Sequence, residues 1–207
     1  MKLVVISDTH GHHRELGRLS GDVLIHCGDV LNAFAPNVGD IEDLDDWFSM
    51  QDFKRILCIA GNHDYEIQKI FDSGKPVFRN AEFLCDESRD IGGYKFYGSP
   101  WTPEITGAAF YLSPADAEIT WSRIPIGTDV LITHTPPLGF LDRNSRGKSC
   151  GCPALKKRVG SVRPRLHCYG HVHASAGRQL ESGVAYVNAA MVGRSYRLKN
   201  RPVVVKI

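Results

Sequence analysis

Residues 3–10 read LVVISDTH, a short apolar run that stops at an acid and a histidine. Its length and its β-branched content are typical of a buried strand. Four later runs also end in polar residues: 23–27 before Gly28-Asp29, 56–60 before Gly61-Asn62-His63-Asp64, 130–133 before His134, and 166–169 before Gly170-His171-Val172-His173. Because layered α/β folds place their sites at strand ends, we expect the five clusters to meet at one edge of the fold.

The rest of the pattern predicts a layered α/β fold with mixed sheets. Strand-like runs also cover 184–188 and 203–207. The segments 82–85 and 94–97 predict an antiparallel pair joined through the stretch DESRDIGG. Helical patterns cover 40–50, 64–72 and a segment from Ser113-Pro114 into Trp121. Neither an internal repeat nor a linker of different composition interrupts the chain, so we expect one domain over residues 1–207.

The composition excludes several classes of protein, but it does not indicate what the chain binds. The chain has 207 residues with 25 Lys and Arg against 23 Asp and Glu, and 43% of its residues are hydrophobic. These values are typical of globular proteins and exclude collagen-like, mucin-like and disordered classes. No apolar stretch approaches the roughly 20 residues of a membrane span, and the first residues lack the features of an export signal. We therefore expect a cytoplasmic protein that does not enter a membrane.

The polar clusters carry the donor atoms of a metal site. In an extended segment, side chains two residues apart point the same way, so Asp8 can face a metal beside His10, and His171 beside His173. Carboxylate oxygens and imidazole nitrogens without thiolates suit Mn, Fe, Ni or Zn better than a structural cysteine-rich zinc site.

Taken together and in this order, the five clusters resemble the signature of the calcineurin-like metallophosphoesterases. The resemblance implies a layered sandwich of two mixed β-sheets flanked by helices. It also implies two divalent metal ions, with Mn favoured and Fe, Ni or Zn as alternatives. The residues implied as ligands are Asp8, His10, Asp29 and His173 for one ion, and Asp29, Asn62, His134 and His171 for the other. Asp29 would then bridge both ions.

The same resemblance implies a mechanism. A hydroxide that bridges the two ions would attack phosphorus, while His63, which is not a ligand in the family pattern, would protonate the leaving group. Asp64 would orient His63, and Asn62 and His63 would also contact the substrate. The implied reaction is hydrolysis of a small phosphoester or nucleotide substrate.

Further stretches are similar to a narrower group, the small metallophosphoesterase-domain-containing proteins of animals and their bacterial relatives. They are GSPWTPE at 98–104, HTPPLGFLDR at 134–143, RPRLHCYGHVH at 163–173 and YVNAA at 186–190. This similarity implies phosphodiester hydrolysis, including that of cyclic nucleotides. Some animal members carry glycine where this chain has His171, so the complete ligand set here favours an active enzyme.

Basic residues gather in one segment, from 142 to 165, where eight lysines and arginines accompany one acid. We expect Arg143, Arg146 and Lys148, in the loop after His134, to bind substrate. The same charges could contact a nucleic-acid backbone, which is a less favoured partner. Alternatives to a phosphodiesterase are a phosphomonoesterase or phosphoprotein phosphatase, and a non-catalytic nucleotide-binding module.

Overall fold

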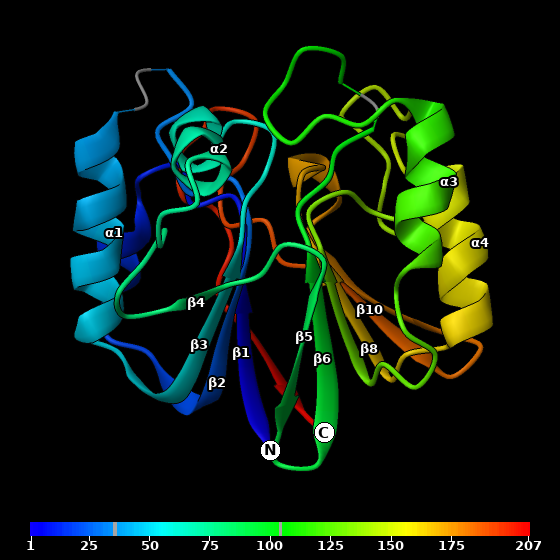
Figure 1. Ribbon diagram of the computed structural model, residues 1–207, viewed down its shortest axis with the longest axis horizontal. Coiled ribbons are helices and arrows are strands. Elements are labelled where there is room, and N and C mark those ends of the chain that lie inside the picture. Colours follow the sequence, from blue (N-terminus) through cyan, green and yellow to red (C-terminus); the bar gives the residue numbers. More distant parts are fainter. Residues whose placement is uncertain (35–36, 104) are drawn as a thin grey trace.

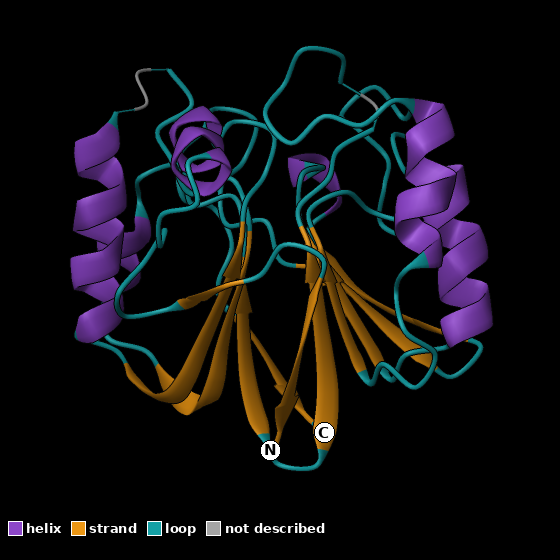
Figure 2. Ribbon diagram, in the orientation of Figure 1, coloured by secondary structure: helices purple, strands orange, loops and turns teal. Residues whose placement is uncertain are grey.

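The computed structural model describes residues 1–34, 37–103 and 105–207. Two β-sheets pack face to face, and helices cover the outer face of each sheet (Figures 1 and 2). This arrangement confirms the predicted sandwich of two mixed sheets flanked by helices. None of the helices in the described ranges has the length and apolarity required to cross a bilayer.

The first sheet has five strands in the order β11-β1-β2-β3-β4. Its strands are β1 (Lys2–Ile6), β2 (Ser20–Cys27), β3 (Asp52–Ile59), β4 (Glu82–Phe83) and β11 (Val203–Lys206). Strands β1 to β4 run parallel, and β11 pairs antiparallel with β1. The helices on its outer face are α1 (Val38–Ser49) and α2 (Tyr65–Asp72), with the short 3-10 helix η1 (His13–Leu16) beside α1.

The second sheet has six strands in the order β5-β6-β7-β8-β10-β9. Its strands are β5 (Glu87–Ile91), β6 (Tyr94–Ser99), β7 (Val130–Thr133), β8 (Leu166–Tyr169), β9 (Gly177–Glu181) and β10 (Val184–Asn188). The four inner strands are parallel, and both edge strands are antiparallel. Helices α3 (Pro114–Ser122) and α4 (Pro153–Val162) cover this sheet, and the 3-10 helix η2 (His173–Ser175) follows β8.

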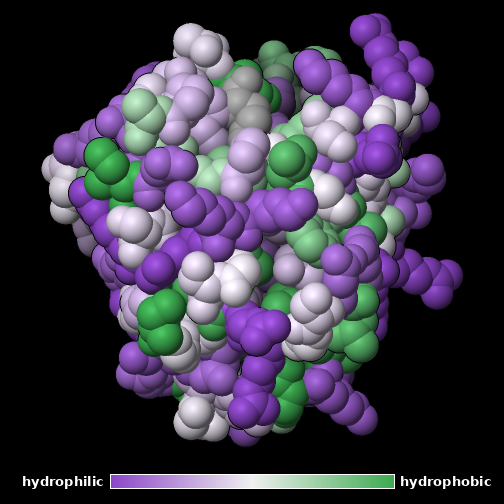
Figure 3. Space-filling model, turned by 90° about the vertical axis from the view of Figure 1, so that its right-hand side faces the viewer, coloured by the Kyte–Doolittle hydropathy of each residue, from purple (hydrophilic) through white to green (hydrophobic). Residues whose placement is uncertain are grey.

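Both faces of the central strands are buried, which explains why their sequences are continuously apolar. In β1, Leu3 and Val5 point into the core between the sheets, whereas Val4 and Ile6 point to the layer beneath α1. A third cluster packs α3 and α4 on the second sheet through Trp121 and neighbouring apolar residues. On the face that these two helices cover, hydrophilic side chains surround scattered hydrophobic ones (Figure 3).

The predicted hairpin is wrong in its pairing. Residues 82–83 form β4 and pair parallel with β3 in the first sheet, and the antiparallel partner of β6 is β5. Strand β5 lies inside the stretch that we expected to be a connection. Gly92 and Gly93 both have positive φ, 58° and 84°, as a two-residue turn of type I′ requires. That turn fixes the register of β5 with β6.

The parallel strands position the functional clusters. The carboxyl ends of β1, β2 and β3 meet those of β7 and β8 at the same end of the sandwich, where the two sheets face each other (Figure 1). Residues that directly follow these strands therefore converge between the sheets.

Candidate metal centre

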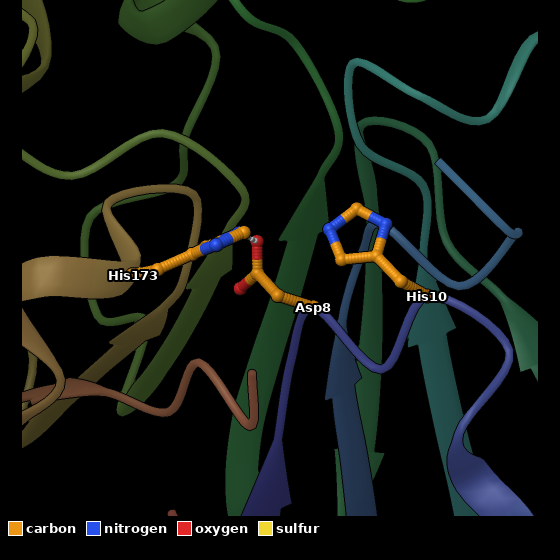
Figure 4. A group of neighbouring side chains, drawn as sticks. All are labelled: Asp8, His10 and His173. Carbon is orange, nitrogen blue, oxygen red and sulfur yellow. Dashed lines mark hydrogen bonds and ion pairs between the residues drawn. The ribbon is translucent and has the colours of Figure 1, made fainter. Parts of the chain in front are cut away.

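Three donors from the two sheets surround one point at this end of the sandwich (Figure 4). Asp8 and His10 follow β1, and His173 follows β8. Their ligand atoms all lie within 4.8 Å of one another. The Asp8 carboxylate lies between the two imidazole rings, with Oδ1 3.2 Å from Nε2 of His173. One oxygen and two nitrogen donors thus converge from segments far apart in the sequence.

A second group shares Asp8 and adds Asp29 and His134, again with ligand atoms within 4.8 Å of one another. Oδ2 of Asp29 lies 3.4 Å from Nε2 of His134 and 3.7 Å from Nε2 of His10. Asp29 therefore lies between the two histidines, whereas Asp8 is the residue that the two donor groups share, and the bridging role of Asp29 stays a prediction.

Asn62 and His171 complete the cluster. Oδ1 of Asn62 lies 3.1 Å from Nε2 of His134 and 2.8 Å from Nδ1 of His171. The backbone N–H of His171 donates to both carboxylate oxygens of Asp8, at 3.0 Å each. The fold thus brings all seven predicted ligands into one connected group.

Two histidines have their tautomer fixed by the backbone. Nδ1 of His10 donates to the carbonyl of Leu31 at 3.2 Å, and Nδ1 of His134 donates to that of Cys27 at 2.8 Å. Each ring then directs Nε2 toward the carboxylates. Nε2 of His10 is buried and has no hydrogen-bond partner among the described residues. Because an unpartnered buried nitrogen is costly, this atom fits a metal ligand, and the donor set fits divalent ions.

The two carboxylates of the cluster carry the negative charge that a cation needs. Burial alone would raise the pKa of Asp29, but the neighbouring His134 and His10 hold it well below its usual value. Burial likewise opposes ionisation of Asp8, and the hydrogen bond and positive charge of His173 outweigh it and lower the pKa. Burial disfavours a charged His134, yet the negative charge of Asp29 raises its pKa to about 10, so this ring must give up a proton to act as a metal ligand. Both carboxylates are therefore ionised at neutral pH.

The backbone of the cluster is strained. Four of the predicted ligands have positive φ, between 44° and 67°: Asp8, His10, Asp29 and His171. Such a conformation costs of the order of 1 kcal/mol or more for each residue that is not glycine. Two glycines add close contacts, since a Cβ on Gly61 would collide with Asp29 and His134, and one on Gly170 with Asp8 and Ser7. Strain and close packing concentrated at one point are typical of a functional site.

His63 and Asp64 occupy different environments although they are adjacent. The His63 ring lies edge-on to that of His10, with centroids 5.1 Å apart, and faces the cavity. The Asp64 carboxylate is fully buried and accepts from the backbone N–H groups of Val30, Leu31 and Gly61. Among the contacts described, none joins this carboxylate to the His63 imidazole. Backbone amides thus take both oxygens of this carboxylate, and the orienting role of Asp64 stays a prediction.

A cavity of about 330 Å³ opens over the cluster. Asn62 and His63, two of the predicted substrate-binding residues, line it. Arg143, Arg146 and Lys148 are not among the described residues of its wall. Their loop reaches the cavity through Asn144, Ser145 and Cys150, while the Arg143 guanidinium donates to the carbonyl of Gly147 within the loop.

Two further cavity residues were missed by the sequence reasoning. Arg194 is the one Lys or Arg side chain among the described residues of the wall. The Tyr196 ring lies edge-on to His10 and His173, with centroid distances of 4.9 Å and 5.3 Å. The sequence signal that could have indicated these two residues is the stretch Arg-Ser-Tyr-Arg at 194–197, which follows strand β10 and has an aromatic residue between arginines.

Comparisons with known proteins agree with this fold. The sequence model of the calcineurin-like phosphoesterases matches residues 1–175. The human metallophosphoesterase domain-containing protein 1 is 31% identical over an alignment that covers 100% of this chain and 71% of that protein. The structure of phosphopantetheinyl hydrolase from Mycobacterium tuberculosis superposes with a TM-score of 0.60 at 17% identity, over 94% of this chain and 90% of that one. TT1561 of Thermus thermophilus also gives 0.60, at 14% identity over 90% and 88% of the two chains.

Proposed function

Because the chain belongs to the calcineurin-like phosphoesterase family, we propose that it is a dinuclear metal-dependent phosphodiesterase for small nucleotides, cyclic ones included. The observation that carries the proposal is a pair of three-donor groups that share Asp8, each with its ligand atoms within 4.8 Å of one another, together with an unpartnered buried nitrogen on His10.

Two overlapping sets of residues would hold the ions. Asp8, His10, Asp29 and His173 would hold one, and Asp29, Asn62, His134 and His171 the other, a division that the family resemblance implies and that the distances from Asp29 to His10 and His134 support. When bound, divalent ions supply Lewis acidity toward phosphate oxygens and make water a nucleophile at neutral pH. The donor atoms suit Mn, which we favour, and also Fe, Ni or Zn.

The remaining cavity residues supply proton transfer and binding. The His63 imidazole faces the cavity and belongs to neither metal-ligand group, so it is free to donate a proton to a leaving oxygen. The Arg194 guanidinium can bind a phosphate oxygen through charge-assisted hydrogen bonds. Arg143, Arg146 and Lys148 would act on parts of the substrate that extend beyond the cavity.

The charge of the wall favours a diester over a monoester. A diester carries one negative charge and a monoester up to two, and the described wall adds a single arginine to the metal-ligand cluster. The cavity also opens to solvent among several loops, which leaves room for ester groups on both sides of phosphorus. Phosphomonoester hydrolysis is the competing activity.

Cysteine chemistry supports a cytoplasmic location as part of this proposal. All six cysteines are free thiols, and Cys27, Cys58, Cys152 and Cys168 are buried. Free thiols are typical of reducing compartments.

The test compares bis-p-nitrophenyl phosphate with p-nitrophenyl phosphate, after chelation and again after addition of Mn²⁺. We expect no turnover in the chelated protein and metal-restored turnover with a higher kcat/KM for the diester. A preference for the monoester would replace the phosphodiesterase by a phosphatase. No turnover by folded protein with any of the four metals would reject the enzyme and favour a nucleotide-binding module.

A further inference from the structure

An exposed aromatic residue lies beside the candidate metal centre. Phe34 leaves 79% of its surface exposed, although most large apolar side chains of this chain are buried. Its ring meets that of Tyr196 at a centroid distance of 5.0 Å and an angle of 67°. Tyr196 in turn contacts the rings of His10 and His173. The rings therefore lead outward from the metal ligands to solvent, with Phe34 last.

The backbone of Tyr196 adopts an unfavourable conformation. Its φ of 54° lies in the left-handed region, which is unfavourable for a bulky side chain. A tight turn enforces it, since N–H of Tyr196 donates to Gly193 and N–H of Gly193 donates to Arg197, each at 3.0 Å. An antiparallel bridge between Val192 and Leu198 closes the turn. The turn thus fixes the aromatic ring over the cluster and brings Arg194 to the same wall.

Core packing does not explain Phe34. A side chain that stays mostly in water gains little from the hydrophobic effect. Aromatic rings that are exposed beside a phosphate-binding site can instead stack on planar rings, and every nucleobase has a face that fits. A nucleotide places a sugar between its phosphate and its base, which matches the order of metal cluster, Tyr196 and Phe34.

We propose that Phe34 and Tyr196 form a stacking surface for the base of a nucleotide whose phosphate lies at the metal centre. The inference rests on the proposed function for the position of the phosphate. It adds that the substrate is recognised by a planar ring, and not as a phosphosugar, a phospholipid or a phosphopeptide. Because stacking is tolerant of the base, we expect weak discrimination among bases.

Binding tests this directly. Calorimetry on the Mn²⁺-loaded protein would compare thymidine 5′-monophosphate with methyl phosphate, which has no ring. We expect the nucleotide to bind at least about tenfold more tightly, and Phe34→Leu and Tyr196→Leu each to reduce that ratio about fivefold or more. The control is Tyr94→Leu, because Tyr94 begins β6 at the opposite end of the sandwich and contacts Arg165. This control should keep the wild-type ratio.

A kinetic pair separates this inference from the proposed function. Thymidine 5′-(p-nitrophenyl phosphate) and methyl p-nitrophenyl phosphate release the same leaving group, so their kcat/KM ratio reports the nucleoside. We expect both substitutions to lower that ratio. Equal affinities for the two ligands, or a preference that survives both substitutions, would overturn the stacking surface. Ring-dependent binding without hydrolysis of either ester would uphold it and reject the phosphodiesterase.

Discussion

A substitution of His63 can test proton transfer without removing a metal ligand. Its imidazole faces the cavity but belongs to neither metal-ligand group. We expect His63→Ala to lower kcat by about 10²- to 10⁴-fold for a diester with an alkoxide leaving group. The loss should be much smaller for p-nitrophenolate, which leaves without a proton, and the metal content should not change. Equal losses for both leaving groups would reject proton donation.

Gly61 tests the close packing of the ligands. An added Cβ would collide with Asp29 and His134, whereas one on Gly160 in α4 meets nothing within 4 Å. We expect Gly61→Ala to raise the dissociation constant for Mn²⁺ at least tenfold, and Gly160→Ala to keep the wild-type value. Competition with a fluorescent chelator measures both. Wild-type affinity in Gly61→Ala would show that the ligands can move apart freely.

At the residue scale, sequence reasoning could identify the residues at the carboxyl ends of strands. Asp8, Asp29 and His134 each directly follow, or nearly follow, a buried strand. The pattern of apolar runs that end in polar residues was therefore enough to predict that they lie at one edge of the fold. Tyr196 and Phe34 lie in irregular segments, where no periodicity fixes the direction of a side chain. Two of the three backbone partners of Asp64, Val30 and Leu31, could not be predicted either, because they lie more than 30 residues away.

At the scale of single elements, a buried histidine links two neighbouring strands in each sheet. His26 of β2 contacts the hydroxyl of Thr9, which follows β1, and His167 of β8 contacts that of Thr133 in β7, each at 2.9 Å. Both imidazoles are fully buried, and burial lowers the pKa of each to about 3. These contacts tie together the strand ends that carry the ligands.

The His167 contact predicts a pH dependence of stability. The unfolded chain binds a proton on this histidine below its ordinary pKa of about 6.5, and the folded chain does not until about 3. The free energy of unfolding should therefore fall as the pH drops from 6.5 toward 3. His167→Gln should remove up to about 1.4 kcal/mol per pH unit of that slope between pH 4 and 6.

Urea denaturation at several pH values measures the slope. An unchanged slope in His167→Gln would contradict the assignment.

The elements themselves were predictable where burial dictates composition. The strands over 130–133, 166–169 and 184–188 have the predicted bounds, since both of their faces are covered. Strand β5 was missed because its sequence, ESRDI, is polar at a sheet edge and is specified by the glycine turn that follows it. Pairing of β4 with β3 depends on contacts that are distant in sequence, which no local pattern encodes.

At the scale of the whole molecule, the candidate ligands join the two sheets. Asp8, His10, Asp29 and Asn62 come from the first sheet, and His134, His171 and His173 from the second. Bound ions would therefore hold the sandwich together at the end where the sheets meet. The family's fold and the position of this site follow from the sequence, whereas the cavity wall depends on how the loops pack.

Metal removal should consequently lower thermal stability. An ion at 100 times its dissociation constant stabilises the fold by about 2.7 kcal/mol. For a chain of this size, that corresponds to a Tm shift of roughly 5 to 10 °C. Calorimetry before and after chelation measures the shift, which added Mn²⁺ should restore. Equal Tm values with and without metal would contradict a cross-link between the sheets.

A centre of two ions joined by Asp29 can be tested by the metal content per chain. Wild type and Asp29→Asn would be equilibrated with Mn²⁺, freed of excess metal and analysed by plasma mass spectrometry. We expect two ions per wild-type chain and less than one in Asp29→Asn, because this carboxylate, which lies near both His10 and His134, would serve both sites. Two ions retained by Asp29→Asn, or fewer than two in the wild type, would contradict it.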